Sequence, residues 1–290
     1  MLAGQFHLFG LVFFLLALSV VAFHWEDSLI WPAINGVEQY YQHDSKNKIV
    51  RTFTPSTMAT VVSGIDANDD ASDTFLLAMQ RFHARLKRSV PDDASTYTIN
   101  PTEAQVIPLE SLHFRTQSPN ATLADANEGY RLYLNASEAP ELQVDAETVY
   151  GTLHGLQTLL QLLQFGWIDP PSSTPVFVLA HIPQRIEDSP LYSYRGILVD
   201  TSRHFLPVTT ILQPQIDLMA AHKLNVLHWH LTDDQSWPWR SDSWPELVQP
   251  HCAACIYTTD TIVQEVVQYA AHRGVRVIVE VDTPGHTRGR

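Results

Sequence analysis

Two histidines and two adjacent aspartates form the densest group of residues that could do chemistry. His228 and His230 lie in Asn225–Thr232 (NVLHWHLT), which we predict to be a strand. Residues two apart on a strand point to the same face. Asp233 and Asp234 follow where this strand ends. Because adjacent carboxylates on a strand diverge, we expect one of them to face a cleft and the other to anchor a loop.

The histidine pair has two interpretations. A His-x-His pair on a strand can present two imidazoles to a metal ion. The same pair can instead consist of hydrogen-bonded groups inside a sheet or barrel, which support the residues that touch a ligand. We favour the second interpretation for His228 and His230 and predict no metal site. A metal hydrolase that binds zinc through this pair is the alternative.

An arginine follows an earlier apolar run, Arg195–Asp200 (RGILVD). Arg203 at this strand end offers a planar fork of donors, which suits paired hydroxyls or a carboxylate. A salt bridge between Arg203 and Asp200 is the alternative use.

A third group of chemical residues follows the run Val275–Val281 (VRVIVEV). Glu280 and Asp282 share one face, and a tight Thr-Pro-Gly turn then presents His286. Acids inside a barrel wall are costly unless they are paired. The simplest arrangement is a network that joins Asp233, Asp282 and His286, with Glu280 in support. Such networks often tune pKa values at active sites.

The elements that carry these residues alternate between strand and helix. The three strands above are separated by two helices, expected over Thr209–His222 and Asp260–Arg273, with Asp260 as the N-cap of the second. Strands that alternate with helices form a parallel sheet, and charged groups at the carboxyl ends of its strands are typical of a (β/α)₈ barrel. Such a barrel takes about 250 residues, so the chain has room for about three of its eight strands. We therefore predict an α/β fold with the first three βα units of a TIM barrel.

The residues before this sheet predict a separate α+β domain. Helical spacing of apolar residues is present over Ser72–Leu86 and Thr148–Phe165, and Tyr130–Leu134 alternates like a strand. Pro183–Pro190 has the composition of a linker. The predicted organisation is a signal peptide over 1–22, an α+β domain over 23–188 and a partial barrel over 189–290.

The first residues are typical of a secretory signal. Phe9–Ala22 is apolar but short for a membrane span, and no later segment is apolar enough to cross a membrane. A signal anchor or a buried helix is the alternative. Asn120 and Asn135 begin N-x-Ser/Thr sequons, which predicts N-glycosylation in the secretory pathway, with a lysosomal or extracellular destination.

Charge and cysteine content exclude other classes of function. The formal net charge of −13 argues against a nucleic-acid-binding surface. Cys252 and Cys255 are the two cysteines of the sequence. We expect them to form a local disulfide or a bond to a partner outside this chain, because a second cysteine pair for zinc is absent from the sequence.

Three long motifs resemble the β-N-acetylhexosaminidases of glycoside hydrolase family 20. They occur in order and at the spacing of that family. Shorter resemblances to the family's N-terminal α+β domain occur upstream. The matching segments are Arg195–His204 (RGILVDTSRH), Lys223–Pro238 (KLNVLHWHLTDDQSWP), Val279–Thr287 (VEVDTPGHT), Glu128–Tyr130 (EGY) and Gly155–Leu159 (GLQTL).

The resemblance implies hydrolysis of terminal, non-reducing β-linked N-acetylglucosamine or N-acetylgalactosamine from glycans and glycoconjugates. It implies no cofactor and a substrate-assisted retaining mechanism, in which the acetamido oxygen of the substrate attacks the anomeric carbon. By motif position, Arg203 would hold the sugar 3- and 4-hydroxyls. Asp233 and His286, with Asp282, would form the network behind the catalytic acid. A homodimer is implied for a complete enzyme.

The sequence departs from the family in one respect. The catalytic Asp-Glu pair of the family lies in a Gly-Gly-Asp-Glu motif, which does not occur in these residues. We therefore expect the 290-residue chain by itself to be inactive. A non-catalytic carbohydrate-binding or regulatory protein derived from a hexosaminidase is the alternative.

Overall fold

The computed structural model of the chain describes residues 49–53, 59–66, 70–88, 98–99, 105–119, 121–135, 142–168, 176–182 and 184–288. The predicted signal peptide over 1–22 and the sequon asparagine Asn120 lie outside the described residues. Asn135 is described and follows the end of a strand in a partly buried position.

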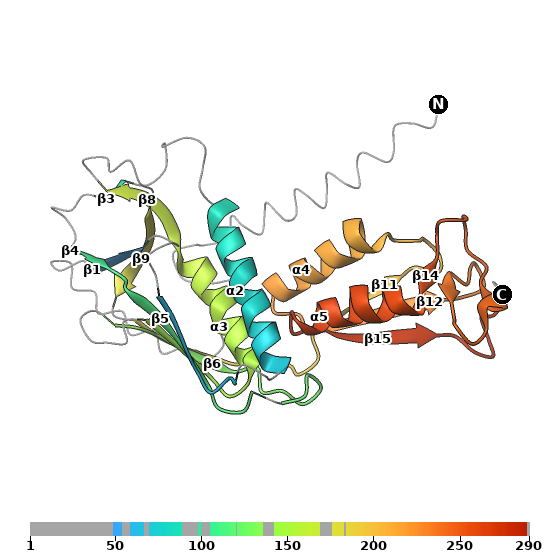
Figure 1. Cartoon of the computed structure of the whole chain (residues 1–290), viewed down its shortest axis with the longest axis horizontal. Helices are drawn as coiled ribbons and strands as arrows, with labels where there is room; N and C mark the ends of the chain where they lie inside the picture. Colours follow the sequence, from blue (N-terminus) through green and yellow to red (C-terminus); the bar gives the residue numbers. More distant parts are fainter. Residues whose placement is uncertain are drawn as a thin grey trace.

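The N-terminal part contains two five-stranded sheets. The first has the order β3-β8-β9-β1-β4 and comprises β1 (Ile49–Phe53), β3 (Thr98–Ile99), β4 (Gln105–Pro108), β8 (Gln164–Ile168) and β9 (Val176–Ile182). The second has the order β10-β6-β7-β5-β2 and comprises β2 (Ala59–Ser63), β5 (Ser111–Thr116), β6 (Tyr130–Leu134), β7 (Leu142–Ala146) and β10 (Gln184–Asp188). Two helices, α2 (Asp70–Arg88) and α3 (Val149–Leu162), lie side by side over the second sheet (Figure 1).

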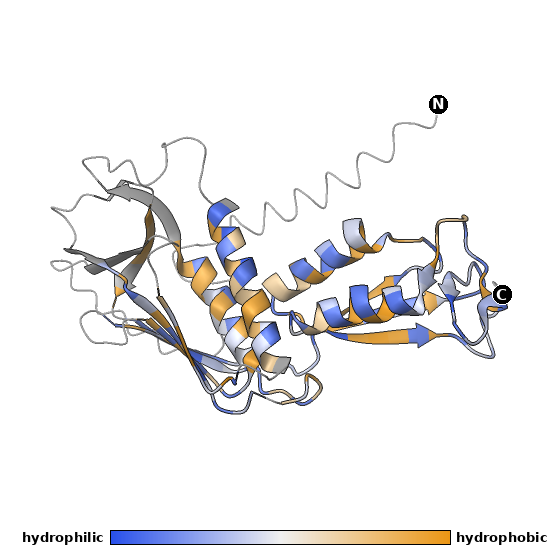
Figure 2. Cartoon of the chain, viewed as in Figure 1, coloured by the Kyte–Doolittle hydropathy of each residue, from blue (hydrophilic) through white to orange (hydrophobic). Residues whose placement is uncertain are grey.

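The core of this part lies between the helices and the second sheet. Buried side chains alternate with partly buried or exposed ones along β5, β6 and β7, so each strand presents one apolar face to the helices. In α2, buried residues recur at helical spacing, as the sequence predicts (Figure 2). Gly155 lets α3 approach closely, because a Cβ atom there would lie 2.5 Å from Val144 Cγ1. The buried residues of this core include Phe75, Phe82, Leu112, Leu132 and Val144.

The helix expected over Thr148–Phe165 ends earlier than predicted. Its start agrees, because the Thr148 Oγ1 accepts a hydrogen bond of 3.3 Å from the Gly151 N–H. The helix ends at Leu162, and the backbone continues as strand β8. Strand pairing with β9 therefore outweighs the helical spacing of the last residues. This long-range pairing was not visible in local periodicity.

The C-terminal part is a three-stranded parallel sheet with helices on one face. Its strands are β11 (Gly196–Asp200), β12 (Val226–Thr232) and β15 (Arg276–Val281), in the order β11-β12-β15. The predicted mixed α/β fold is confirmed. The outer strands β11 and β15 are edges, so the described residues form no closed barrel.

The two crossover helices begin irregularly. The first is a π-helical turn over Val208–Leu212 that continues as α4 (Gln213–Ala221), and the second is a π-helical stretch over Thr261–Gln268 that continues as α5 (Tyr269–Ala271). The prediction that Asp260 caps the second of these helices is wrong. Its backbone is already helical, and its side chain makes no capping hydrogen bond among the described residues. Instead, Thr258 Oγ1 accepts from the Thr261 N–H at 3.1 Å. Short strands β13 (Trp239–Arg240) and β14 (Tyr257–Thr258) and a 3₁₀ turn at Pro245–Leu247 complete this part.

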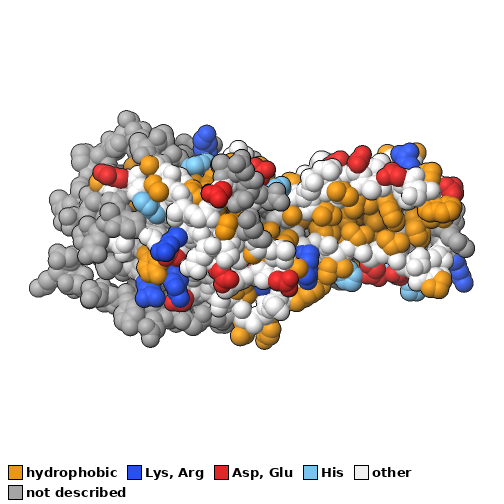
Figure 3. Space-filling view, turned by 60° about the horizontal axis from the view of Figure 1, so that its bottom comes forward, with side chains coloured by type: hydrophobic (Ala, Val, Ile, Leu, Met, Phe, Trp, Pro, Cys, Tyr) orange, Lys and Arg blue, Asp and Glu red, His pale blue; other side chains and the backbone are white. Residues whose placement is uncertain are grey.

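The two faces of the three-stranded sheet differ. Trp229 on β12 points toward α4 and α5 and is fully buried, and its Nε1–H donates to Thr201 Oγ1 at 2.8 Å. The opposite face carries Leu198 and Ile278, which are 58% and 38% exposed. Figure 3 shows apolar side chains gathered over this end of the molecule. One face of the sheet is thus a packed core, whereas apolar side chains of the other reach the surface.

A buried lysine joins the two parts of the chain. Lys223, in the turn before β12, is 6% exposed and has a left-handed backbone with φ 57°. Its Nζ donates to Tyr130 Oη at 2.9 Å, to Thr158 Oγ1 at 2.9 Å and to Asp188 Oδ2 at 3.0 Å. Burial lowers the pKa of Lys223, although the adjacent Asp188 carboxylate counters this effect.

A second ionic contact lies beside the first. Glu128 accepts hydrogen bonds of 2.9 and 2.8 Å from the Arg195 guanidinium at its two carboxylate oxygens. The Asn225 Nδ2 also donates to Glu128, at 3.2 Å. Arg195 and Asn225 directly precede β11 and β12, so the N-terminal part fixes where both strands begin.

We expect Lys223→Met to destabilise the protein by about 3–5 kcal/mol, because removal of one partner leaves the largely buried Asp188 charge without its cation. Methionine keeps the length of the side chain and meets the same left-handed backbone. Urea unfolding measures the free energy. Lys87→Met, at an exposed position of α2, is the matched control. If Lys223→Met lowers the free energy of unfolding by no more than Lys87→Met does, this role of the ion pair is contradicted.

Candidate active site

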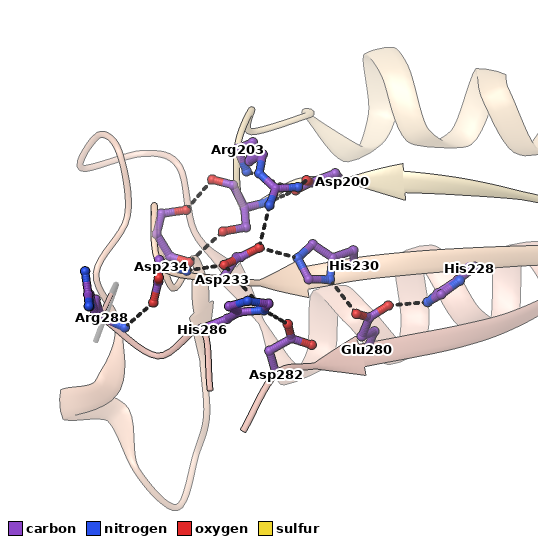
Figure 4. Close-up of polar contacts among 12 residues, drawn as sticks. Asp200, Arg203, His228, His230, Asp233, Asp234, Glu280, Asp282, His286 and Arg288 are labelled. Carbon is purple, nitrogen blue, oxygen red and sulfur yellow. Dashed lines mark hydrogen bonds and ion pairs between the residues drawn. The ribbon is translucent and has the colours of Figure 1, made fainter. Parts of the chain in front are cut away.

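The register of the parallel sheet aligns three charged residues in one row. Asp200 on β11 is the Cα partner of His230 on β12, and His230 is the partner of Glu280 on β15. Partners in adjacent strands point to the same face. The row therefore lies on the face opposite the α4 and α5 helices, close to the carboxyl ends of the strands (Figure 4).

Asp233 is the centre of the charged cluster. The residue is 2% exposed, and its Oδ2 accepts from Arg203 Nη2 at 2.9 Å and pairs with His230 Nε2 at 3.0 Å. Its Oδ1 accepts from the Asp234 N–H at 2.5 Å. Burial raises the pKa of Asp233, but these hydrogen bonds and the nearby cations outweigh burial and lower it overall. Asp233 is therefore a carboxylate at neutral pH.

Arg203 bridges the ends of β11 and β12. Its Nη1 donates to Asp200 Oδ2 at 2.7 Å, while its Nη2 reaches Asp233. The backbone N–H groups of Ser202 and Arg203 both donate to Asp200 Oδ1 at 3.0 Å. The Arg203 side chain is nevertheless 60% exposed. The salt bridge to Asp200 is thus present, and it holds a guanidinium that still faces solvent.

The predicted association of Asp233, Asp282 and His286 is present. His286 Nδ1 pairs with Asp282 Oδ2 at 2.7 Å and lies 4.0 Å from Asp233 Oδ1. The hydrogen bond to His286 lowers the pKa of Asp282 and raises the pKa of His286. The His286 side chain is 64% exposed, so this imidazole can meet a molecule that arrives from solvent.

The two histidines of β12 converge on Glu280. His230 Nδ1 lies 2.9 Å from Glu280 Oε1, and His228 Nε2 pairs with Glu280 Oε2. They do share a face, as the sequence predicts. One ligand atom from each of His230, Asp233 and Asp282 lies within 4.8 Å of the others. Because His230 and Asp233 already pair with each other, we describe this group as a charge network and assign it no metal.

The adjacent aspartates diverge as expected. Asp233 points into the charged cluster, whereas Asp234 Oδ1 accepts from the Arg288 N–H at 2.9 Å (Figure 4). Asp234 thereby ties the loop after β12 to the loop after β15. The two carboxylates have separate structural tasks.

Sequence reasoning missed a set of contacts that brace the loops. Ser202 Oγ donates to the Ser236 carbonyl at 2.9 Å, and Ser236 Oγ donates to the Ser202 carbonyl at 2.7 Å. His251 Nε2 also bonds to the Ser202 carbonyl, at 2.7 Å. The one available signal was that both serines follow strand ends.

The Cys252–Cys255 disulfide next to His251 confirms the predicted local bond.

The Asp282–His286 pair predicts a defined pH dependence. A lowered Asp282 pKa stabilises the protein above about pH 3.9, and this contribution is lost as pH falls through the folded-state pKa. A raised His286 pKa stabilises it below about pH 6.5, and this contribution is lost as pH rises through the folded-state pKa. We expect Asp282→Asn to lower the free energy of unfolding most between about pH 4 and 6.5.

Urea unfolding across a series of pH values tests this dependence. Asp242→Asn, at an exposed position of the same part of the chain, is the control and should show no such window. A difference between Asp282→Asn and the parent that is constant from pH 3 to 9 would refute the assignment.

Comparison with known proteins finds family similarity along both parts of the chain. A model described as glycosyl hydrolase family 20, catalytic domain, matches residues 192–289, and a model described as beta-acetyl hexosaminidase like matches residues 21–162. Beta-hexosaminidase 3 of Arabidopsis thaliana is 41% identical over 180 residues, covering 61% of this chain and 32% of that protein. Beta-hexosaminidase subunit beta of Mus musculus is 40% identical over 185 residues, covering 62% of this chain and 32% of that protein.

Solved structures agree with the sequence matches. Flavobacterium johnsoniae chitobiase has a TM-score of 0.60 at 28% identity, covering 83% of this chain and 34% of that one. Streptomyces plicatus N-acetyl-beta-hexosaminidase has a TM-score of 0.59 at 26% identity, covering 90% of this chain and 47% of that one. The chain spans about a third of the length of the curated relatives it matches. From the two family models and these relatives together, the chain belongs to glycoside hydrolase family 20.

Proposed function

We propose that this chain is part of a β-N-acetylhexosaminidase that removes terminal, non-reducing β-linked N-acetylglucosamine or N-acetylgalactosamine. The observation that carries the proposal is the exposed Arg203 side chain, held between the Asp200 and Asp233 carboxylates at the strand ends. The relatives named above are beta-hexosaminidases, and the solved relatives include a chitobiase. Glycans and glycoconjugates that end in an N-acetylhexosamine are the proposed substrates.

The proposed fold of the catalytic part is a (β/α)₈ barrel, of which β11, β12 and β15 are the first three strands. Two observations support it: the strands are parallel, and the helices lie on one face. The proposed boundary between the 23–188 and 189–290 domains agrees with two separate hydrophobic clusters, one within residues 71–186 and the other within 199–275.

The side chains at the strand ends have defined tasks in this proposal. Arg203 donates N–H groups to hydroxyls of the terminal sugar, while the two carboxylates fix its orientation and keep it charged. Asp233 and His286, with Asp282, form the proposed network behind the catalytic acid. The acetamido oxygen of the substrate attacks the anomeric carbon in the substrate-assisted scheme. The acid that protonates the leaving oxygen belongs to the Gly-Gly-Asp-Glu motif, which is absent from these residues.

The proposed location is the secretory pathway, with a lysosomal or extracellular destination. The Cys252–Cys255 disulfide supports an oxidising compartment, and Asn135 is a glycosylation candidate near the end of β6. In the described part of the chain, every helix is too short or too polar to cross a membrane. Dimerisation of a complete enzyme remains a prediction.

Sugar binding tests the proposed role of Arg203. We expect the 290-residue chain to bind N-acetylglucosamine, and Arg203→Ala to weaken binding about 10- to 100-fold, because hydrogen bonds from a charged group contribute about 1.5–3 kcal/mol. Ligand-observed NMR or calorimetry measures the dissociation constant. Arg131→Ala is the control, because Arg131 is paired on the surface of the N-terminal part with Glu187. Equal affinities of parent and Arg203→Ala would contradict the assignment.

An aryl N-acetyl-β-glucosaminide assay separates binding from catalysis. We expect no turnover above the blank by the 290-residue chain, because the Asp-Glu pair is absent from it. Turnover by the purified chain would show that another group serves as the acid. Binding without turnover would also fit the alternative, a non-catalytic carbohydrate-binding protein. Hydrolytic activity of a longer gene product would exclude that alternative.

A further inference from the structure

One buried histidine at the strand ends lies between two carboxylates. His230 Nε2 is 3.0 Å from Asp233 Oδ2, and His230 Nδ1 is 2.9 Å from Glu280 Oε1. A neutral imidazole has one N–H and one bare nitrogen, whereas an imidazolium has two N–H groups. Two ionised carboxylates can only accept. The imidazolium is therefore the form of His230 that satisfies both neighbours.

Glu280 fixes the far end of this arrangement. Its Oε1 pairs with His230 and its Oε2 pairs with His228, so both of its oxygens are engaged from β12. The path from Glu280 to the solvent-facing arginine runs through His230 and Asp233, because Asp233 Oδ2 accepts from both His230 and Arg203. Figure 4 shows these side chains as one continuous line of polar contacts.

We propose that Glu280 is a positioning residue for Arg203, and that it acts by holding His230 with both ring nitrogens protonated so that Asp233 Oδ2 stays turned toward Arg203. This inference rests on the proposed sugar-binding function of Arg203. With Glu280 neutral, His230 can lose a proton. The proton is lost from Nδ1, which faces residue 280, while Nε2–H still donates to the ionised Asp233. That bond is then no longer charge-assisted, so Asp233 Oδ2 is held less firmly in the position that it shares with Arg203.

The groups around His230 agree with this charge assignment. Asp200 faces it from β11 and Glu280 from β15, while Asp282 and Asp233 face it from just after the ends of β15 and β12, so the acids outnumber the cations. Burial lowers the pKa of His230, but hydrogen bonds to Asp233 and Glu280 outweigh burial and raise it. The cations near this group are Arg203, which pairs with Asp233, and, when protonated, His228 and His286.

Glu280→Gln tests the proposal, since it removes the charge and keeps the shape. The probe is the full 290-residue chain with ¹⁵N-labelled histidine and arginine. Long-range ¹H–¹⁵N spectra report the protonation of each His230 ring nitrogen across pH, and the Arg203 guanidinium signals report its restraint. The sugar probe is N-acetylglucosamine. Glu265→Gln, at an exposed position on the helical stretch before α5, is the matched control.

In the parent we expect His230 to carry both ring protons at pH 6.5, because its pKa is raised by its two carboxylate neighbours. In Glu280→Gln we expect its titration midpoint to fall by about one pH unit or more, the Arg203 signals to broaden, and the affinity for N-acetylglucosamine to drop about 5- to 10-fold. Glu280→Asp, which keeps the charge, should recover part of each effect. The control should match the parent.

Two results would overturn the proposal. One is a His230 ring that is neutral at pH 6.5 in the parent, and the other is a Glu280→Gln variant in which either the His230 midpoint or the Arg203 signals are unchanged. If the midpoint falls and Arg203 loosens while the parent binds no N-acetylglucosamine, the positioning role is supported and the sugar-binding function fails. The two claims are therefore separable.

Discussion

The register of three parallel strands is the constraint on which the charged site depends. It places Asp200, His230 and Glu280 side by side in one row. Two carboxylates flank one imidazole, and such a row is tolerable in a sheet only when the charges are paired. A slip of one residue in β12 would turn His230 into the helix-facing core and bring Trp229 to the polar face. The fully buried Trp229 side chain therefore fixes the position of the chemistry on the opposite face.

The N-terminal part contributes to the site through the starts of the strands. Lys223 and Asn225 precede β12, and Arg195 precedes β11. All three bond to residues of the α+β part, namely Asp188, Tyr130, Thr158 and Glu128. Loops at the opposite ends are braced by Ser202 and Ser236. Strands β11 and β12 are thus held at both ends, which limits the freedom of Arg203 and Asp233 at their carboxyl ends.

Much of this organisation follows from the sequence because it is encoded locally. Strand β6 coincides with the predicted Tyr130–Leu134, and the meeting of Asp233, Asp282 and His286 follows from their position after parallel strands. The errors arose where distant pairing decides the outcome. The last residues of the helix predicted over Thr148–Phe165 join β8. Thr258, not Asp260, caps the helix that begins near residue 260.

The partners of the site residues could not be derived from sequence. Spacing indicated that His228 and His230 share a face, but only the register of β15 shows that both reach Glu280. Likewise, the use of Arg203 as a bridge between two carboxylates depends on the geometry of two separate strand ends. Local patterns predicted which residues gather, whereas tertiary packing decides which atoms bond.

The location of bound sugar is the most direct test of the central claim. Amide chemical shifts of the 290-residue chain, followed during titration with N-acetylglucosamine, map that location. We expect the largest changes at the ends of β11, β12 and β15, around Arg203, Asp233 and His286. Changes confined to the N-terminal part, or their absence at these strand ends at saturating sugar, would contradict the claim that this charged cluster is the sugar-binding site.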